Sequence, residues 1–268
     1  MTDAHSIISK VKQKRISDRL VEDKRLDGRG LLDYRDINVD VGVIDKAEGS
    51  ALVSLGKTKV LVGVKMETGT PYSDTPNSGV LTVNVELVPL ASPSFEPGPP
   101  NEDSIELARV VDRGLRESKA LDLEKLCITP RKKVLIIFVD VYVLDHDGNL
   151  FDASALASIA ALTSTKMRKF NVDDEGEIEF LEETQPLPIT NQPIEITLGK
   201  INNKILVDPS LDEEHALECQ ITMAIGKDGE LCAIQKRGSS TFRKEEIFQA
   251  YDIARDKAQN IRERFLVN

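Results

Sequence analysis

The sequence predicts an α+β protein in which two layers, each built from strands followed by a helix, are fused in one chain of 268 residues. Runs rich in β-branched residues occur in both halves and are separated by short turn-forming segments. Apolar residues at helical spacing follow each set of strands. A chain of this length holds one large domain or two modest ones, and we expect the two layers to pack together.

The first half should open with a helical arm and continue as a sheet. Residues 1–28 show weak helical periodicity, which breaks at the segment "LDGRG". Residues 49–66, "GSALVSLGKTKVLVGVKM", predict two strands joined by a tight turn at Gly56 and Lys57. Residues 80–90 alternate between apolar and polar side chains, as a half-buried strand does.

Two helices flank the strongest strand of the first half. The first helix is predicted to begin at Asp103 and Ser104, which are favourable N-cap residues, and its apolar stripe should dock on the sheet. Residues 132–148, "KKVLIIFVDVYVLDHDG", give the clearest strand signal in the chain. Residues 151–167 are rich in small side chains and predict a second helix that packs closely against its neighbours.

The second half repeats the order of strands and then helix. Its entry, "DDEGEIEFLEE" (173–183), has seven acids and no base, which predicts a solvated connector. Strands with Asn-Asn and Asp-Gly turns should follow, and a long helix should close the chain. We therefore divide the chain into an N-terminal helical arm (1–28), a first half (29–172), an acidic connector (173–188) and a C-terminal half with the closing helix (189–268).

Composition limits the possible functions. The formal net charge of −10 argues against a protein that coats nucleic acid unaided, although it permits a local basic surface. No apolar run approaches the roughly 20 residues of a membrane span, so no membrane partner is expected. Cys127, Cys219 and Cys232 lack the spacing of a metal site and predict free structural thiols in a reducing cytoplasm.

Three arginines form the candidate binding surface. Arg109, Arg113 and Arg116 lie in "ELARVVDRGLR" at spacings of four and three residues, so a helix would project all three from one side. One interpretation is a solvated face, on which they pair with acids of the same helix. The other is a short cationic strip that binds an anionic ligand on a chain that is acidic overall.

The order of these motifs resembles the RNase PH family. The resemblance is carried by "RLDGRGLLDYRDI", by the hairpin "GSALVSLGKTKVLVGV" and by a strand that ends just before a helix. Residues 70–128, from "TPYSDTPNSG" to "LDLEKLCI", narrow it to the non-catalytic ring subunits of the archaeal exosome and their eukaryotic relatives. It implies an RNase PH-like fold, whose first half is like domain 2 of ribosomal protein S5 and whose second is the C-terminal RNase PH half.

The resemblance also implies partners. Such a subunit alternates with a catalytic RNase PH-like sister subunit, so that three heterodimers form a hexameric ring. RNA-binding cap subunits join the ring, which degrades single-stranded RNA from its 3′ end with phosphate as the attacking group. No cofactor is implied.

The positions that would carry catalysis are altered in this chain. The resemblance implies that active members hold phosphate with a Gly-Ser/Thr-Arg loop, but here Gly148 is followed by Asn149 and Leu150. The aspartates around this loop should repel an anion; they are Asp145, Asp147 and Asp152. We therefore expect the loop not to bind phosphate.

The acid pair and the basic residues of active members are changed as well. Glu214 can stand at the first carboxylate position, but the second is Gln220, which does not ionise. The arginines that precede the main helix in active members are replaced by "EPGPPNEDS". We therefore expect no catalytic residue in this chain, and no metal site, because the adjacent residues of "DEEH" would point in different directions along a strand.

Three functions remain open at this point. The leading one is a non-catalytic subunit in which Arg109 and Arg113, one helical turn apart, grip successive phosphates of the RNA 3′ end near the border with the catalytic subunit. Arg116 ranks below them, because it would serve a subunit interface equally well. The alternatives are an active phosphate-dependent 3′-5′ exoribonuclease that uses Glu214 and Asp208, and an architectural ring member that never touches RNA.

Overall fold

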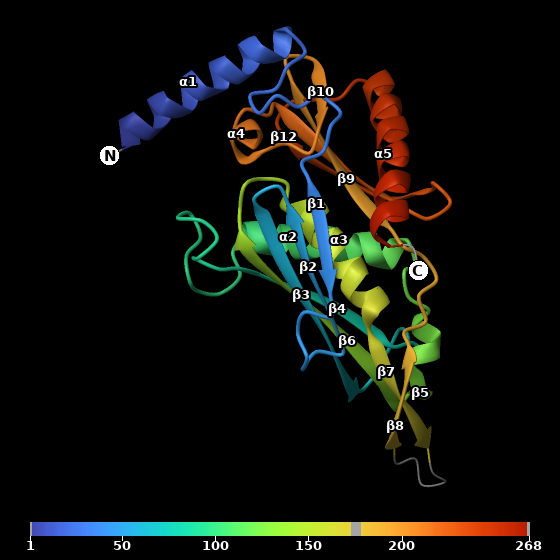
Figure 1. Ribbon diagram of the computed structural model, residues 1–268. Coiled ribbons are helices and arrows are strands. Elements are labelled where there is room, and N and C mark those ends of the chain that lie inside the picture. Colours follow the sequence, from blue (N-terminus) through green and yellow to red (C-terminus); the bar gives the residue numbers. More distant parts are fainter. Residues whose placement is uncertain (1, 173–177, 267–268) are drawn as a thin grey trace.

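The computed structural model of the protein describes residues 2–172 and 178–266, and it consists of two stacked halves with a helical arm (Figure 1). The first half holds strands β1–β6 and helices α2 and α3. The second half holds strands β9–β12 and helices α4 and α5. This arrangement confirms the predicted class, α+β with two fused strand-and-helix layers.

The sheet of the first half is mostly antiparallel. Its strands lie in the order β1 (Ile37–Val41), β2 (Gly49–Leu55), β3 (Thr58–Gly69), β6 (Lys133–Asp145) and β4 (Val80–Leu87), and β5 (Cys127–Thr129) also pairs with β6. Only β4 runs parallel to its neighbour β6 among these pairs. The predicted hairpin is confirmed, with Gly56 at a φ of 58° in the turn between β2 and β3.

Helices α2 (Glu102–Glu117) and α3 (Leu150–Ser164) lie between the sheets of the two halves, and the short 3-10 helix η1 (Leu123–Leu126) follows α2. The predicted start of α2 was wrong. Asn101, not Asp103 or Ser104, caps it, and the Asn101 side chain accepts a hydrogen bond from the Ser104 N–H at 2.9 Å. The predicted end of α3 was also too late, because the chain leaves the helix at Thr165 and continues as a strand.

The second half is a four-stranded antiparallel sheet in the order β10 (Lys204–Val207), β9 (Ile194–Ile201), β11 (Cys219–Ile225) and β12 (Leu231–Gly238). Its predicted turns are confirmed by positive φ angles at Asn202, Asn203 and Gly229. The short helix α4 (Leu211–Glu214) follows β10, and the closing helix α5 (Lys244–Phe265) packs on β9 and β11.

A two-stranded hairpin joins the halves. Strand β7 (Lys166–Val172) pairs with β8 (Ile178–Pro186), which lies within the predicted acidic connector, and the acidic segment 173–177 lies outside the described residues. Lys169 forms an ion pair with Glu183 at 2.7 Å, so the basic strand partly neutralises the acidic one. The division of the chain at residues 28, 172 and 188 stays a prediction.

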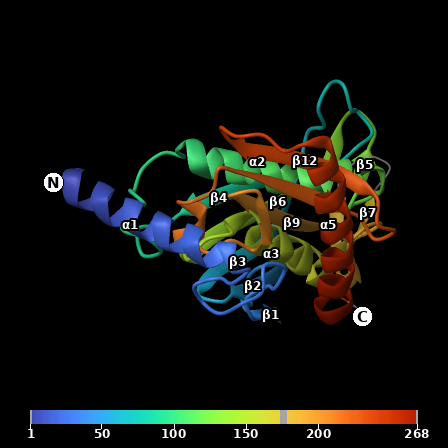
Figure 2. The same cartoon turned by 90° about the horizontal axis from the view of Figure 1, so that it is seen from above.

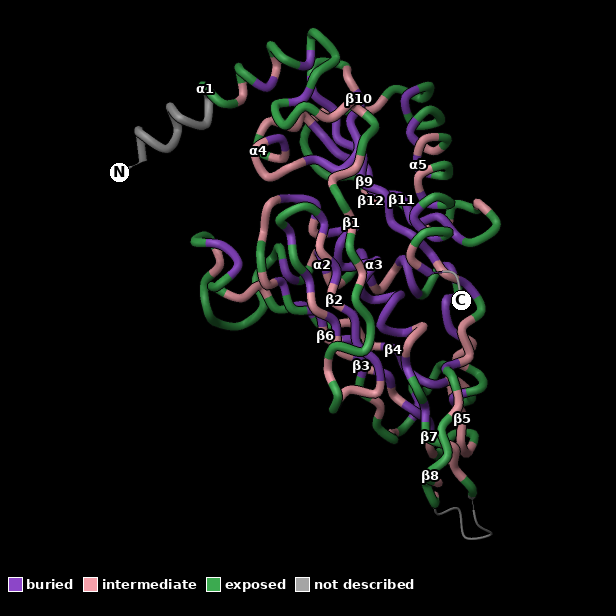
Figure 3. Tube along the Cα trace, viewed as in Figure 1, coloured by how far each residue is buried: buried purple, intermediate pink, exposed green. Residues whose placement is uncertain are grey.

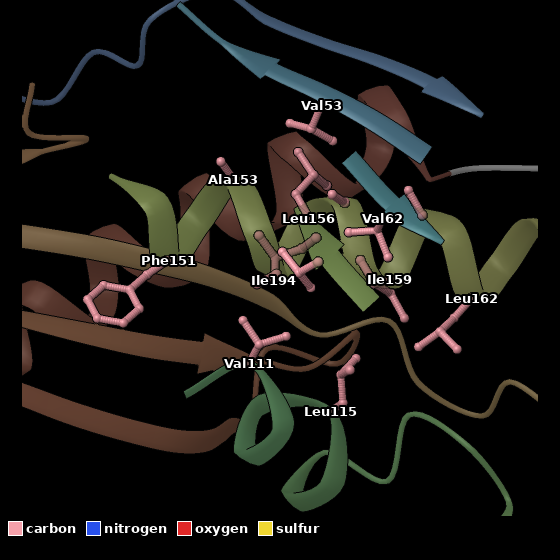
Figure 4. Packing of buried hydrophobic residues seen from close by; sticks show 14 of the residues in the cluster. Val53, Val62, Val111, Leu115, Phe151, Ala153, Leu156, Ile159, Leu162 and Ile194 are labelled. Atoms are coloured by element: carbon pink, nitrogen blue, oxygen red, sulfur yellow. The ribbon is translucent and has the colours of Figure 1, made fainter. Parts of the chain in front are cut away.

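The core is shared by both halves and is built around α3. Twelve consecutive residues of this helix, 151–162, are buried, because its small side chains let a sheet approach on each side. Val53 and Val62 of the first sheet and Ile194 of β9 lie around Leu156 and Ile159 of α3 (Figure 4). The buried segments of the two sheets converge on this helix (Figure 3).

The helical arm is α1 (Thr2–Val21), which extends away from the body of the molecule (Figure 2). It is attached near its C-terminal end, where Ile16 and Leu20 pack with Ile201 and Leu206 of the second half. Within residues 2–172 and 178–266, no helix is long and apolar enough to span a membrane.

Candidate functional site

The outward face of α2 carries the three predicted arginines, which differ in how far they are exposed and in whether they already have partners. The buried side of the helix contains Leu107, Val111 and Leu115, as its spacing predicts. Arg109 is exposed, and within the described ranges its guanidinium has no hydrogen-bond or ion-pair partner. This side chain is therefore available to an anionic ligand.

Arg113 and Arg116 are tied to neighbouring groups. Arg113 is half-buried, and its Nη1 donates to Oε1 of Gln235 on β12 at 3.0 Å. Arg116 forms a 2.6 Å ion pair with Asp112 and donates from Nη2 to the Leu81 carbonyl at 3.0 Å. Within the described residues, pairing with an acid of the same helix is therefore seen for Arg116, whereas Arg113 bonds to a neutral side chain of β12 and Arg109 has neither kind of partner.

The β6–α3 loop, residues 146–149, is the place where the family resemblance would put phosphate. All four of its backbone N–H groups are already used. They donate from His146 to the Ala91 carbonyl (3.2 Å), from Asp147 to Thr58 Oγ1 (3.0 Å), from Gly148 to His146 Nδ1 (3.3 Å) and from Asn149 to Glu214 Oε1 (2.7 Å). A phosphate could bind these amides only by displacing an internal acceptor.

The carbonyl groups of the loop are held from the first half of the chain. Arg35 donates from Nη1 to the Asp147 carbonyl at 2.6 Å and from Nη2 to the Gly148 carbonyl at 3.2 Å. Thr58 Oγ1 also donates to the Gly148 carbonyl, at 2.7 Å. Gly148 has a φ of 90°, and a Cβ on it would lie 2.4 Å from the Leu211 backbone nitrogen. The loop is therefore rigidly packed against α4.

A buried ionic network lies under the loop. Asp208 is fully buried and accepts from Arg35 Nη2 at 2.7 Å, from Arg29 Nη1 at 2.8 Å and from Asn149 Nδ2 at 2.8 Å. Burial alone would raise the pKa of Asp208, but the hydrogen bonds and charge of Arg35 outweigh it and lower that pKa. Asp208 is therefore a structural anion, and it is not placed to donate a proton.

The same ionic network includes the "LDGRG" turn, residues 26–30, and holds it in place. Arg29 also pairs with Asp27 at 2.8 Å, and the buried Arg25 pairs with Glu213. Arg25 donates in addition to the carbonyls of Val207 and Asp208, each at 2.7 Å.

Asp152 points into the protein and does not face the phosphate position. It is buried, and one carboxylate oxygen accepts from Tyr34 Oη at 2.6 Å, from Asn149 Nδ2 at 2.9 Å and from the Thr197 N–H at 3.1 Å. Burial raises its pKa to about 6. Asp152, one of the three acids predicted to surround the loop, thus lies in the core and makes its hydrogen bonds there.

Glu214 is the acid in direct contact with the loop. It is half-buried on α4, and burial raises its pKa to about 7 although the Asn149 N–H and the charges of Arg237 and Arg35 favour the ionised form. The chain therefore places a carboxylate beside the amide at the start of α3, which is the position where an anion would dock.

A cavity of about 830 Å³ opens beside this contact, between α2, α4, β12 and the loop that follows β4. Its polar side chains include Asp103, Glu106, His146, Glu214, His215, Gln220 and Arg237. Arg237 pairs with Asp103 at 2.9 Å and with Glu106 at 3.4 Å, and His146 stacks on Phe95 with ring centroids 5.3 Å apart. The cavity thus brings together side chains from segments that lie far apart in the sequence.

The described part of the chain contains no cluster of three or more His, Cys, Asp or Glu side chains that could hold a metal ion. The side chain of His5 lies outside the described residues. Cys127, Cys219 and Cys232 are free thiols.

Several functional positions were not found from the sequence. Arg35 and Thr58, which fix the β6–α3 loop, carry no local motif and lie about ninety residues or more from it in sequence. Arg237 lines the cavity from the end of a strand, and Phe95 lines it from a proline-rich loop. Only the fold brings these side chains together.

The family of the chain follows from comparison with known proteins. The model of the 3′ exoribonuclease family, domain 1, matches residues 33–168, and the model of domain 2 matches residues 191–257. The protein belongs to this 3′ exoribonuclease (RNase PH) family. The strand-and-helix halves described above correspond to its two domains.

Individual relatives narrow the comparison within this family to components of an exosome complex. The exosome complex component Rrp42 of Thermococcus kodakarensis is 54% identical over 97% of this chain and 96% of its own length. The component of the same name from Methanosarcina mazei is 48% identical over 99% of this chain and 97% of its own. A chain in the solved Archaeoglobus fulgidus exosome with RNA bound to the active site superposes with a TM-score of 0.87 at 48% identity, and covers 97% of this chain and 99% of that one.

Proposed function

We propose that the protein is a non-catalytic subunit of an archaeal exosome, and that it grips the 3′ end of RNA through Arg109 and Arg113. The observation that carries the proposal is the contrast within the site. Every N–H group of the β6–α3 loop has an internal acceptor, whereas Arg109 is exposed on α2 without a partner in the described part of the chain.

The ion pairs and hydrogen bonds of its acidic residues support the proposal that this chain does not carry out phosphorolysis. Asp208 is ion-paired to Arg29 and Arg35 and has a lowered pKa, so it is a poor proton donor. Gln220 cannot ionise at all, and Glu214 is hydrogen-bonded to the loop that would have to receive phosphate. An attacking phosphate would have neither a free amide cradle nor an acid pair.

The proposed partners go beyond the names of the relatives, which say only that those proteins are components of an exosome complex. We propose that the chain alternates with a catalytic RNase PH-like sister subunit, three heterodimers forming a hexameric ring in the cytoplasm, and that RNA-binding cap subunits sit on this ring. The sister would supply the phosphate site and the remaining cations. Only a short strip of this acidic chain then needs to be positive.

Arg109 and Arg113 suit phosphate groups because guanidinium stays charged and donates two hydrogen bonds in a fork. Arg113 would have to exchange its neutral partner Gln235 for a phosphate, which replaces a hydrogen bond to an uncharged amide with one to an anion. Arg116 ranks below them because Asp112 and the Leu81 carbonyl already occupy it. Contacts of this kind bind RNA with little regard to sequence and weaken with salt.

The test is charge reversal in the assembled complex. Arg109→Glu/Arg113→Glu should lower affinity for single-stranded RNA by about tenfold or more, and should reduce the slope of log Kd against log salt by about 1.4, which is about 0.7 for each lost phosphate contact. Assembly with the sister subunit should persist, as measured by the mass of the complex. The matched control, Lys244→Glu/Arg255→Glu, makes the same charge change at exposed positions of α5 and should leave RNA affinity nearly unchanged.

Two results would contradict the proposal in different ways. Unchanged RNA affinity in the Arg109/Arg113 variant would favour a purely architectural subunit. Release of nucleoside diphosphates from RNA and phosphate by the chain alone, lost in Glu214→Ala, would favour the active exoribonuclease.

A further inference from the structure

Glu195 of β9 is a buried acid that lies directly beneath α2. Only 3% of its surface is exposed, and its Oε2 atom has no hydrogen-bond partner among the described residues. The helix packs so closely on it that a Cβ on Gly114 would overlap Glu195 Oε1. An ionised carboxylate without hydrogen bonds is costly to bury, so this environment favours the protonated acid.

Arg113 lies beside this acid and does not pair with it. The two side chains line one small cavity together with Gln235. In the described structure the Arg113 guanidinium forms no ion pair with Glu195 and donates instead from Nη1 to Gln235 Oε1 at 3.0 Å. A guanidinium next to an ionised carboxylate would pair with it, because a charge-assisted hydrogen bond is stronger than one to a neutral amide. The observed choice of partner therefore also indicates an uncharged acid.

The other groups that face Glu195 do not favour its ionised form. Asp152 of α3 and Tyr34 line a second small cavity with it. Burial raises the pKa of Glu195 well above its ordinary value, the charge of Asp152 raises it further, and the charge of Arg113 lowers it without outweighing them. Burial also raises the pKa of Tyr34, so this phenol stays neutral. The remaining side chains of the two cavities are uncharged, including those of Thr222 on β11, Gln235 on β12 and Ile261 on α5.

We propose that Glu195 is a positioning residue for Arg113: as a neutral acid it leaves the guanidinium on the outer face of α2, and when ionised it draws the guanidinium inward into an ion pair. The inference rests on the proposed RNA grip by Arg113, and it names the buried group that controls that grip. On ionisation the Glu195 proton passes to water, and Arg113 exchanges Gln235 Oε1 for a carboxylate oxygen. The cation and the new anion then offset each other, so a phosphate on the outer face is attracted less.

The protonation state of Glu195 is tested on the full chain by infrared difference spectroscopy between wild type and Glu195→Gln. At about pH 7 the wild type should show the carbonyl stretching band of a protonated carboxyl, which is missing from Glu195→Gln and shifts in deuterium oxide. The matched control is Glu246→Gln. Glu246 is buried as well, but it pairs with Lys200 at 2.8 Å and has a pKa lowered to about 2, so its removal should delete no such band. A wild type without the Glu195 band would overturn the proposal.

The availability of Arg113 is tested in the complex with the sister subunit, by comparing the RNA affinities of wild type and Glu195→Gln as pH rises from about 6.5 to about 9. The affinities should agree within about 1.5-fold at the acidic end, and wild type should bind about threefold more weakly at the alkaline end, as expected for one lost phosphate contact. The other titrating groups are present in both complexes and largely cancel in the ratio. A ratio that does not change with pH would overturn control of Arg113 by Glu195.

Arg113→Ala separates failure of this inference from failure of the RNA grip. If Arg113→Ala binds RNA as tightly as wild type at neutral pH, the grip by Arg113 is itself wrong. If it binds more weakly while the ratio of wild type to Glu195→Gln stays constant, Arg113 contacts RNA and Glu195 does not control it. When the inference holds, adding Glu195→Gln to Arg113→Ala should leave the pH profile of RNA binding unchanged.

Discussion

The β6–α3 loop and the outward face of α2 are both rich in polar groups, but they differ in where those groups find partners. In the loop, amides and carbonyls are paired internally with Thr58, Arg35 and Glu214. On α2, the guanidinium of Arg116 is bonded to Asp112 and that of Arg113 to Gln235, whereas that of Arg109 has no partner within the described residues. The difference teaches that a charged sequence motif identifies a binding surface only when its groups are not already satisfied by the fold.

This contrast predicts a separation of effects. Substitutions under the loop should reduce stability and leave RNA affinity alone, since the groups there serve the fold. Substitutions on the outer face of α2 should reduce RNA affinity and leave stability alone, because exposed arginines contribute little to folding.

The largest expected effect is on stability, at the ionic network. Asp208→Ala should lower the free energy of unfolding by about 3–5 kcal/mol, because Arg29 and Arg35 would lose their shared buried partner. Denaturant unfolding measures this. The control is Asp212→Ala, which removes an exposed ion pair with Lys12 and should cost about 1 kcal/mol or less. Similar losses in the two variants would show that the network does not stabilise the fold.

A somewhat smaller loss is expected at the loop itself. Gly148→Ala should cost about 2–4 kcal/mol, since it adds a side chain at a positive φ and drives it against the start of α4. Gly42 also has a positive φ, of 71°, but has open space around it, so Gly42→Ala should cost about 1 kcal/mol. The difference between the two variants isolates the close contact. A difference near zero would mean that the loop can move away from α4.

The third effect is a pH dependence. Glu214 has a pKa of about 7 in the folded protein against an ordinary value of 4.5, so the folded state holds its proton more tightly. Its contribution to stability is complete below the unfolded pKa and is lost as pH rises from about 4.5 through 7, by up to about 3 kcal/mol. Glu214→Gln cannot titrate and should lack this loss.

Chemical unfolding of wild type and Glu214→Gln at acidic and mildly alkaline pH compares the two directly. Other groups that titrate, such as Asp152 and His146, are present in both proteins and largely cancel in the difference. Parallel stability curves for the two proteins would show that the Glu214 carboxyl is ionised as easily when folded as when unfolded.

The smallest expected effect is a difference in RNA affinity between substitutions of Arg109 and Arg116, which both lie on α2. In the assembled complex, Arg109→Ala should weaken RNA binding about threefold, as expected for one lost phosphate contact, while Arg116→Ala should change it less than about twofold. Filter binding at moderate salt is sensitive enough to separate these values. If Arg116→Ala had the larger effect, its pair with Asp112 would have to open on RNA binding, and our ranking of the two would be reversed.

Much of the fold could be predicted because local patterns and tertiary packing agree. The stripe that includes Leu107, Val111 and Leu115 predicted the buried side of α2, and the run from 132 to 148 predicted the central strand β6. The strand β8 was not foreseen in the acidic tract, because its charge is balanced across the hairpin by residues such as Lys169. A charge tract read alone does not reveal its partner strand.

The site was predicted less completely than the fold. The loss of the Gly-Ser/Thr-Arg motif could be read directly at Gly148, Asn149 and Leu150. The acceptors that replace phosphate could not, since Thr58 and Glu214 approach the loop from 89 and 65 residues away. Likewise, only the structure shows that Arg116 is engaged by its own surroundings and that Arg109 is not engaged by any of the residues described.

The buried position of Arg25 has a consequence for synthesis of the chain on the ribosome. This side chain emerges early, yet its partners Val207, Asp208 and Glu213 lie 182 to 188 residues later. Until they emerge, a cation that ends fully buried stays in water, and the segment around it has nothing to close upon. A prematurely terminated product would therefore keep an unfinished N-terminal region, exposed to proteases, while the complete polypeptide would not.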